Sequence, residues 1–533
     1  MKHLLGSAAA MALLAFGTNA AFADYTLTIL HTNDFHSRVE PINKYDSTCE
    51  GEDVTENKCF GGSARLFTAL KAAKGGAENP ILLDGGDQFQ GTLFYTRYKG
   101  KAAAEMMNAL GYEAMTVGNH EFDDGPKVLR DFIKAVEFPV LLANADVSKE
   151  PELAEAVKPS VVVEKNGEKI GLLGVAPADT GELSSPGKSI TFSDPVEALK
   201  REVKTLTDQG VDKIVLLSHS GYREDQRIAA EVPGLDVIVG GHSHSLLSNT
   251  DDKAEGPYPT MVKGPDGHDV PIVQAYAYGK YLGELMVTFD DAGVVKSASG
   301  QPLILDGQIT EDSKLAKRVA ELAKPLEEIR KKVVAETTAP IDGSRDSCRA
   351  GECEMGDLVA DAMLDRVKDQ GVAIAITNGG GLRASIDAGP ITMGEVLSVL
   401  PFQNTLATFK LKGADIKAAL ENGVSQVEDG AGRFPQVAGL QFTWSRSAKP
   451  GERISEVMVE QDDETVPIDP DETYLVVSNN YMRTGGDGYT AFAEKATDAY
   501  DFGPGLDEVL ADYLARDNIP YEPYTDGRIT EAH

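Results

Sequence analysis

Short runs of apolar residues alternate with helical patterns through the first 310 residues of the chain. The apolar runs are rich in Val, Ile and Leu, which is typical of strands buried on both faces. Alternating strands and helices predict an α/β domain built of packed layers. The predicted strands are residues 25–31, 80–83, 114–117, 139–142, 213–217 and 236–239, and the predicted helices are residues 63–74, 101–110, 127–136 and 195–207.

A charged, helix-favouring stretch at residues 310–336 separates this region from a second one of mixed pattern. In the second region the pattern predicts helices at residues 356–367 and 413–421 and a strand at residues 372–377. We therefore expect two α/β domains, residues 24–310 and 336–533. Residues 311–335 are expected to form a linker helix that acts as a hinge.

The first 23 residues have the pattern of a cleaved signal peptide. Lys2 precedes an apolar run at residues 4–16, and residues 21–23 supply a small-x-small cleavage sequence. The apolar run is shorter than the roughly 20 residues that a membrane-spanning helix needs. No later stretch has that length and apolar character. The sequence predicts a periplasmic or secreted protein without a membrane anchor, with Asp24 at its mature N-terminus.

Four cysteines form two close pairs in different halves of the chain. Four cysteines allow three pairings, and the distance between the pairs favours local disulfides, Cys49–Cys59 and Cys348–Cys353. Export to an oxidising compartment would allow both bonds to persist. The alternative is a four-thiolate zinc site, but the spacing within the two pairs does not follow the usual zinc pattern.

The formal net charge of −33 limits the partners that the protein can have. No basic block compensates this charge, which argues against binding to a nucleic-acid polymer. The same charge repels anionic substrates at long range. A phosphate-binding site in this chain must therefore be locally positive, through metal ions or clustered arginines.

Potential metal ligands follow the predicted strands of the first domain, where the carboxyl ends of strands in α/β folds converge. Five of the nine histidines belong to these motifs. A mixture of Asp, His and Asn ligands suits zinc, manganese or cobalt better than calcium. The motifs are Asn33-Asp34-Phe35-His36, Asp84-Gly85-Gly86-Asp87, Gly118-Asn119-His120-Glu121, Ser218-His219-Ser220 and Gly240-Gly241-His242-Ser243-His244.

The order of these motifs resembles that of the calcineurin-like metallophosphoesterases, and residues 29–36 and 117–123 resemble the 5′-nucleotidase family. The resemblance implies a four-layer α/β/β/α first domain and two divalent metal ions, zinc first, with manganese or cobalt as alternatives. It also implies that His120, held by Asp123, stabilises charge on the phosphoryl group; a helix-capping pair is the alternative. We expect His31, inside a strand, to be structural. The implied ligands are Asp34, His36, Asp87 and His244 for one ion, and Asp87, Asn119, His219 and His242 for the other.

The second domain carries a glycine triplet followed by an arginine at residues 377–383, and loop aromatics within residues 432–439 and 479–488. A glycine triplet before an arginine can present N–H groups and a guanidinium to phosphate, although glycine-rich turns are common. Loop aromatics can clamp a base by stacking, although most aromatics are core residues. These segments are similar to the C-terminal domain of ecto-5′-nucleotidases, and Gly380 of the triplet is a candidate substrate-binding residue. The resemblance implies phosphate contacts from Arg349 and Arg383, with Arg345 as a third, a nucleoside contact from Asn378, base stacking by Phe434 and Tyr481, and ribose binding by Asp487.

Together these motifs predict an exported enzyme that hydrolyses nucleoside 5′-monophosphates such as AMP at the interface of its two domains. The alternatives on the same fold are a UDP-sugar or NAD pyrophosphatase and a 2′,3′-cyclic nucleotide phosphodiesterase. A non-catalytic nucleotide-binding protein is the alternative from another class, and it is disfavoured because every candidate ligand position holds a competent ligand. We expect nucleotides as partners, no nucleic-acid polymer, and a monomer or homodimer.

Overall fold

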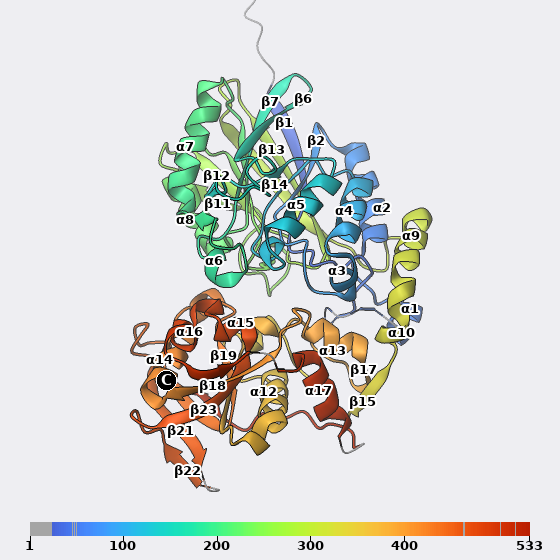
Figure 1. The fold of residues 1–533 in the computed structure, drawn as a ribbon. Coiled ribbons are helices and arrows are strands. Elements are labelled where there is room, and N and C mark those ends of the chain that lie inside the picture. The colour runs from blue at the N-terminus through green and yellow to red at the C-terminus, as the bar shows by residue number, and fades with distance from the viewer. Residues whose placement is uncertain are drawn as a thin grey trace, which may run out of the picture.

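The computed structural model describes residues 24–532 with the exception of residues 45, 47, 50, 462, 463, 502, 517 and 518. The predicted signal peptide, residues 1–23, lies outside the described residues. Two α/β bodies are stacked on each other, the first coloured blue to green and the second orange to red (Figure 1). The predicted two-domain α/β organisation is confirmed.

Two six-stranded sheets form the centre of the first domain. In one, β1 to β4 are parallel, β13 is antiparallel to β1, and β14 is antiparallel to β13. In the other, β7, β9, β10 and β12 are parallel, with β6 and β11 at the edges. The sheet strands are β1 (Tyr25–Thr32), β2 (Pro80–Asp84), β3 (Ala114–Thr116), β4 (Val140–Leu141), β6 (Ser160–Lys165), β7 (Glu168–Val175), β9 (Ile214–Ser218), β10 (Val237–Val239), β11 (Thr260–Lys263), β12 (Asp269–Val273), β13 (Tyr281–Phe289) and β14 (Val295–Ile304); β5 (Ala145–Asp146) pairs with β8 (Thr191–Phe192).

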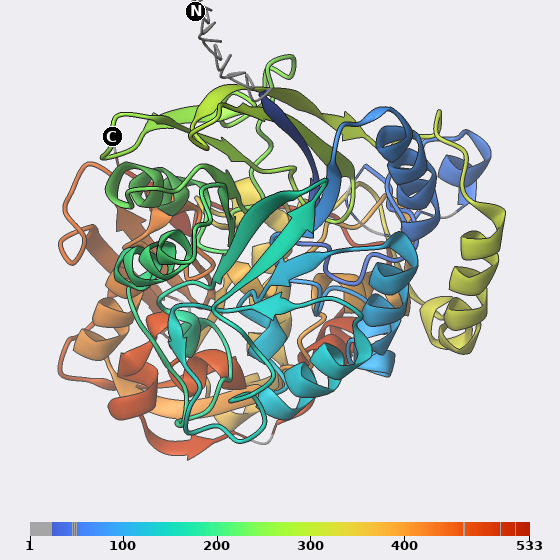
Figure 2. The ribbon, with the colours of Figure 1, turned by 90° about the horizontal axis from the view of Figure 1, so that it is seen from above.

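Helices cover the outer faces of both sheets, as the view from above shows (Figure 2). Alternate residues of a strand face opposite sides, so Ile29 packs between the sheets while Leu30 packs against helices. Helices α2, α4 and α5 cover the first sheet, and α7 and α8 cover the second. This is the expected four-layer α/β/β/α arrangement. The helices are α1 (Gly51–Thr55), α2 (Ser63–Gly76), α3 (Leu93–Tyr98), α4 (Lys101–Leu110), η1 (His120–Phe122), α5 (Pro126–Ala135), α6 (Thr180–Leu183), α7 (Pro195–Asp208) and α8 (Tyr222–Glu231).

The second domain is built on a mixed five-stranded sheet of order β19-β16-β23-β18-β24, with a four-stranded sheet, β22-β21-β20-β25, packed beside it. Helices α12, α13 and α17 pack in one core, and α14 and α16 in another. The strands are β15 (Val333–Thr337), β16 (Ile374–Asn378), β17 (Gly389–Thr392), β18 (Leu406–Lys412), β19 (Pro435–Ala438), β20 (Leu440–Trp444), β21 (Ile454–Gln461), β22 (Glu464–Pro467), β23 (Thr473–Asn479), β24 (Thr497–Tyr500) and β25 (Ile529–Glu531). The helices are α11 (Arg345–Cys348), α12 (Glu354–Val367), η3 (Lys368–Gln370), η4 (Gly379–Gly381), α13 (Met393–Val399), α14 (Gly413–Gly423), η5 (Val427–Asp429), α15 (Asn480–Arg483), η6 (Gly486–Gly488), α16 (Thr490–Glu494) and α17 (Leu506–Ala515).

The segment between the domains differs from the single helix that the sequence predicts. Helix α9 (Ser313–Ala323) starts where Asp312 caps it, by accepting N–H bonds at 3.1 and 2.9 Å. Pro325 cannot donate the next backbone hydrogen bond, and the chain continues as η2 (Lys324–Leu326), α10 (Glu327–Arg330) and then β15, which pairs with β17. The segment is therefore helical in three pieces as far as Arg330, and the prediction of a single helix to its end is wrong from β15 onward. The hinge role of the segment stays a prediction.

Both cysteine pairs form local disulfides, with Cα–Cα distances of 5.7 Å for Cys49–Cys59 and 5.1 Å for Cys348–Cys353. A zinc site built from the four thiolates is thereby excluded. In the part of the chain that the structure describes, no helix has the length and apolar character needed to cross a bilayer.

Candidate active site

The carboxyl ends of the parallel strands place the candidate ligands of the first domain at one edge of the two sheets. An unusual backbone conformation accompanies this arrangement, because a positive φ is strained for residues other than glycine. Five candidate ligands adopt it, with φ between 48° and 69°. Such strain persists where the surrounding structure imposes it, and it is typical of functional sites. The five residues are Asp34, His36, Asp87, His242 and His244.

The side chains form two clusters that can each hold a metal ion, Asp34 with His36 and His244, and Asp87 with His219 and His242. In the first cluster, Nε2 of His244 lies 3.2 Å from Oδ1 of Asp34 and 3.3 Å from Nε2 of His36. In the second, Nε2 of His219 lies 3.0 Å from Oδ2 of Asp87.

Asp87 lies between the two clusters, because the same Oδ2 atom is 3.8 Å from Nε2 of His36 in the first. Asn119 joins the second cluster, with Oδ1 3.0 Å from Nδ1 of His242. The structure thus brings together all seven predicted metal ligands, and it puts Asp87 in the position that a bridging carboxylate would need.

Backbone carbonyl groups fix the orientation of two of these imidazoles. Nδ1 of His36 donates to the carbonyl of Phe89 at 2.9 Å, and Nδ1 of His219 donates to that of Gly85 at 2.6 Å. In a neutral ring, Nε2 then carries a lone pair directed into the cluster. Among the described residues, Nε2 of His219 has no hydrogen-bond partner although it lies beside the Asp87 carboxylate. Two facing acceptors require a cation, so this donor set fits a divalent metal ion.

The shifted pKa values of His219 and His242 also indicate that the second cluster favours a bound positive charge. Burial lowers the pKa of His219, but the carboxylates of Asp87 and Asp34 raise it to about 10. Burial lowers the pKa of His242 to about 3, and the charge of His219 acts in the same direction. One position in the second cluster therefore attracts a cation strongly, while His242 stays neutral and able to act as a ligand.

The buried carboxylate of Glu121 holds the two loops that carry Asp87 and Asn119. Its Oε1 accepts N–H bonds from Gln88 at 2.8 Å and Phe89 at 3.2 Å. Its Oε2 accepts N–H bonds from Asp87 at 3.0 Å and Gly118 at 2.6 Å. The sequence predicted no role for Glu121, although it belongs to the same motif as Asn119 and His120.

His120 stands at the edge of the metal clusters and is held by Asp123. Its Nδ1 lies 2.7 Å from Oδ2 of Asp123, and its backbone N–H donates to Oδ1 of Asp87 at 2.9 Å. Burial lowers the pKa of His120, but Asp123 and Asp87 outweigh this effect and raise it above the ordinary value. The ring also stacks on Phe402 of the second domain, with ring centroids 5.4 Å apart.

Three arginines of the second domain face the metal clusters. Arg345 donates to the carbonyl of His242 at 3.2 Å, and Arg383 donates to Nε2 of His36 at 3.0 Å. Arg349 donates to the carbonyl of Gly430 at 3.3 Å, while its Nε has no hydrogen-bond partner in the described part of the chain. Burial and the charges of neighbouring arginines lower the pKa of Arg345 and Arg349. This crowding of like charges would be relieved by an anion.

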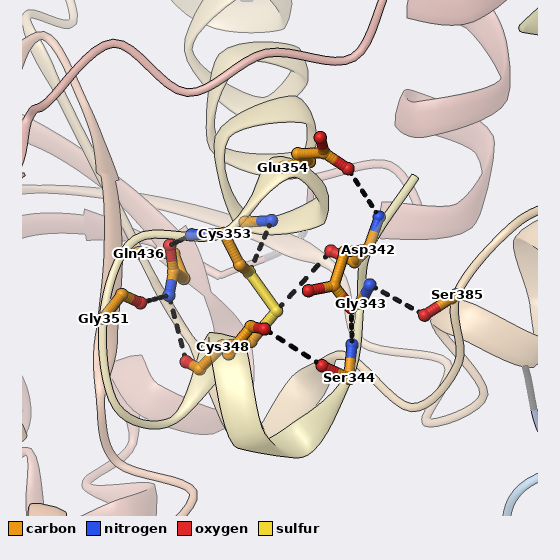
Figure 3. Close-up of a disulfide and its surroundings, with 11 residues drawn as sticks. Asp342, Gly343, Ser344, Cys348, Gly351, Cys353, Glu354, Ser385 and Gln436 are labelled. Carbon is orange, nitrogen blue, oxygen red and sulfur yellow. Dashed lines mark hydrogen bonds between the residues drawn. A yellow bond between two sulfur atoms is a disulfide. The ribbon is translucent and has the colours of Figure 1, made fainter. Parts of the chain in front are cut away.

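Arg349 belongs to a short loop closed by a disulfide, and Figure 3 shows this disulfide and the hydrogen bonds around it. The bond between Cys348 and Cys353 joins the end of α11 to the start of α12. The side-chain amide of Gln436 donates to the carbonyls of Cys348 at 3.0 Å and Gly351 at 2.7 Å. The loop that contains Arg349 is therefore held both by its covalent link and by the neighbouring strand β19.

Four other predicted substrate residues of the second domain lie near these arginines, on the wall of the same cavity. Asn378 donates to Oδ2 of Asp487 at 2.7 Å, and Tyr481 donates to Oδ1 of Asp487 at 3.0 Å. The Tyr481 ring lies so close to Gly486 that a Cβ there would be 2.5 Å from ring atoms. The backbone N–H of Gly380 donates to the carbonyl of Gly432 at 2.8 Å. The Asp487 carboxylate thus has both oxygens engaged by residues of this domain.

A single cavity of about 1110 Å³ connects these groups and is lined by both domains. One part of its wall holds metal-cluster residues and the three arginines, and another part holds the Tyr481 and Asp487 group. The predicted residues in its wall are Asp87, Asn119, His120, Asp123, His242, His244, Arg345, Arg349, Asn378, Gly380, Arg383, Tyr481 and Asp487.

Comparisons with known proteins agree with this geometry. Residues 27–246 match the family model described as calcineurin-like phosphoesterase, and residues 333–494 match that of the 5′-nucleotidase C-terminal domain. The 5′-nucleotidase of Diplobatis ommata is 39% identical over 98% of this chain and 93% of its own length. The chain belongs to the 5′-nucleotidase family.

Two further 5′-nucleotidases support this membership. The human 5′-nucleotidase is 38% identical over 98% of this chain and 94% of its own length. The crystal structure of a 5′-nucleotidase precursor from Thermus thermophilus has a TM-score of 0.91 and 42% identity, and covers 95% of this chain and 99% of that chain. As a member of this family with a metallophosphoesterase domain, the chain is a metal-dependent phosphoric monoester hydrolase.

One predicted substrate residue of this 5′-nucleotidase family member does not reach the cavity. Phe434 is fully buried in the core of the second domain, where its ring centroid is 5.6 Å from that of Trp444. Phe434 is not among the described residues that line the cavity. In this arrangement its ring has no surface left for a base, so its stacking role stays a prediction that the geometry does not support.

Phe402 is an aromatic residue of the cavity wall that the sequence did not single out. It lies in a loop after α13, in the sequence Leu400-Pro401-Phe402-Gln403-Asn404, and the Arg383 guanidinium is 5.6 Å from its ring centroid. An aromatic residue between proline and polar amides is the same kind of signal that favoured Phe434. His31 occupies the structural position expected of it, since it is buried and bonds to Tyr258 at 2.9 Å.

Proposed function

We propose that the chain hydrolyses nucleoside 5′-monophosphates to nucleoside and phosphate, with the reaction at the interface of the two domains. One observation supports this most strongly. A single cavity connects the two candidate metal clusters to Arg345, Arg349 and Arg383. None of these arginines forms an ion pair with a carboxylate in the described part of the chain. The same cavity continues to the Tyr481 ring and the Asp487 carboxylate. The charge pattern fits a phosphate group, and the further wall fits a base and ribose.

Two divalent ions are the cofactor that this arrangement supports, with zinc as the first choice. Mixed His, Asp and Asn donors suit zinc, manganese or cobalt. Divalent ions there supply Lewis-acid stabilisation of the phosphoryl oxygens and make a water molecule acidic enough to attack at neutral pH. Asp34, His36, Asp87 and His244 would hold one ion, and Asp87 would share the other with Asn119, His219 and His242.

The side chains around the clusters supply the remaining stabilisation. His120 keeps Nδ1 on Asp123, which leaves Nε2 to donate to an oxygen of the phosphoryl group. Arg345, Arg349 and Arg383 can each donate charged hydrogen bonds to the same group, and such bonds are shorter and stronger than neutral ones. These groups stabilise the charge that develops during phosphoryl transfer.

The nucleoside end is proposed to use Tyr481 for the base and Asp487 for the ribose. The Tyr481 ring lines the cavity beside Asp487, so a base can stack on it while the sugar meets the carboxylate. A carboxylate accepts hydrogen bonds from two neighbouring hydroxyl groups, as a ribose presents. Asn378 holds that carboxylate in place through its bond to Oδ2. Phe402 belongs to the phosphate end, because it packs on His120 and Arg383.

We also propose that the protein acts outside the cytoplasm, in the periplasm or as a secreted enzyme. The signal-like residues 1–23 and the two disulfides support this. Disulfides persist in oxidising compartments and are rare in the cytosol.

The function is tested on AMP, UDP-glucose, NAD, 2′,3′-cyclic AMP and a small phosphate ester without a base. Phosphate release is measured for AMP and the small ester. Loss of substrate is followed by chromatography for the other three, because their first cleavage releases no inorganic phosphate. Each reaction is run with the purified protein as isolated, after chelation, and after zinc, manganese or cobalt is added back. We expect AMP to have the highest kcat/KM and activity to follow bound metal. A higher kcat/KM for UDP-glucose, NAD or the cyclic nucleotide would refute the monophosphate assignment.

A further inference from the structure

Ser184 contacts the pair formed by His120 and Asp123, although no sequence motif points to it. Its Oγ donates to Oδ1 of Asp123 at 2.6 Å. The other carboxylate oxygen, Oδ2, lies 2.7 Å from Nδ1 of His120. The three residues therefore form a chain in which each oxygen of Asp123 has a separate partner. His120 and Asp123 are largely buried, with side chains 12% and 15% exposed.

Ser184 also lies where the two domains meet. It directly follows helix α6 (Thr180–Leu183), and α6 packs against η6 (Gly486–Gly488) of the second domain. That segment contains Asp487, which is bonded to Asn378 and Tyr481. Ser184 itself lines the cavity. The segment that carries Ser184 therefore rests on the loop proposed to bind ribose.

We propose that Ser184 is a positioning residue that orients Asp123 for His120, and that its own position depends on the contact between α6 and η6. This inference rests on the proposed function, since it assigns Ser184 to the same reaction. A carboxylate held at one oxygen can rotate about its side-chain bonds, and the imidazole it holds would move with it. A hydrogen bond at the second oxygen removes that freedom, so the His120 ring keeps one orientation toward the phosphoryl group.

The arrangement would also link recognition to chemistry. When the second domain is docked, η6 supports α6, and the bond from Ser184 holds the Asp123 carboxylate. A substrate with a nucleoside binds the loop around Asp487 and stabilises this contact. The reacting pair is then aligned in the same state that holds the nucleoside.

The test uses the full chain with its metal restored and the variant Ser184→Ala, with AMP as substrate. We expect kcat to fall by about tenfold to a hundredfold, as for other residues that orient a catalytic group, with KM changed by less than about threefold. The matched control is Ser189→Ala. Ser189 donates the same kind of bond, from Oγ to a carboxylate oxygen of Glu150 at 2.6 Å, but does not contact Asp123. The control should keep the wild-type kcat.

A double-mutant cycle separates positioning from a general structural effect. If Ser184 acts through Asp123, the variants Asp123→Ala and Ser184→Ala/Asp123→Ala should have the same kcat, because the second change removes nothing further. A wild-type kcat for Ser184→Ala, or a full additional loss in the double variant, would overturn the proposal. A wild-type chain that hydrolyses the small ester but not AMP would refute the proposed substrate instead, and the cycle would then be measured on that ester.

Discussion

Glu121 offers a sharp test of how the metal site is built. Its buried carboxylate accepts backbone N–H bonds from Gln88 and Phe89 at one oxygen, and from Asp87 and Gly118 at the other. The substitution Glu121→Gln keeps the size and shape of the side chain but replaces one oxygen by an NH₂ group. That group cannot accept a hydrogen bond and faces N–H groups of the backbone.

The expected cost follows from the number of bonds lost. Whichever way the amide is oriented, two buried N–H groups lose their acceptor, and each unsatisfied buried donor costs about 1–3 kcal/mol. The total is about 2–6 kcal/mol by the same principle, and it falls on the loops that carry Asp87 and Asn119. If about 2 kcal/mol of this cost weakens metal binding, the affinity of the protein for the metal ion falls by roughly thirtyfold, since about 1.4 kcal/mol corresponds to a factor of ten.

The assay measures bound metal by elemental analysis after equilibration with a metal buffer, together with kcat for AMP and thermal unfolding. The control is Glu137→Gln, the same change at an exposed position. We expect Glu121→Gln to lose metal at concentrations that saturate the wild type and the control, with lower kcat and a lower unfolding temperature. Wild-type metal content, activity and stability in Glu121→Gln would refute the idea that this carboxylate organises the loops.

Further predictions concern the metal ions, the base and the pH dependence of stability. Chelation should abolish activity, and zinc, manganese or cobalt should restore it; full activity in a protein shown to be metal-free would contradict this. Asp87→Asn should lower activity more than any other single ligand substitution, because Asp87 lies between both clusters. Tyr481→Ala should raise KM for AMP by the equivalent of about 1–3 kcal/mol of stacking and leave hydrolysis of the small ester unchanged. Phe434→Ala should instead lower the unfolding temperature through loss of core packing, and a raised KM for AMP alone would restore its predicted stacking role. Burial raises the pKa of Asp357 to about 9, so the folded state keeps a proton that the unfolded state releases from about pH 4 upward. The free energy of unfolding should therefore fall as pH rises from about 4 to 9. In thermal melts over this pH range, Asp357→Asn should show a smaller fall in unfolding temperature than the wild type. An equal fall in both proteins would show that Asp357 does not cause it.

Much of the fold and the metal site could be predicted because the signals are local. Buried parallel strands are continuous apolar runs, and the ligand motifs follow them directly, so the ends of β1, β2, β3, β9 and β10 could be placed within a few residues. Parallel strands bring their carboxyl ends to one edge, and that rule was enough to predict that Asp34, Asp87 and His219 would meet. The linker was less predictable, since its charged composition favours a helix that Pro325 interrupts.

The sequence by itself determined which chemistry is available: ligand types, their order along the chain, the arginines and the cysteine pairs. It could not decide which of two similar loop aromatics faces the cavity, because that depends on packing across the second domain. Phe434 packs in the core against Trp444, and Phe402 lies in the cavity wall beside His120. It also could not show that Ser184 meets Asp123, or that Glu121 joins two loops, since these contacts connect segments distant in the chain. Only the tertiary structure decided them, because a hydrogen bond between distant segments exists only once the packing of the layers has placed both partners.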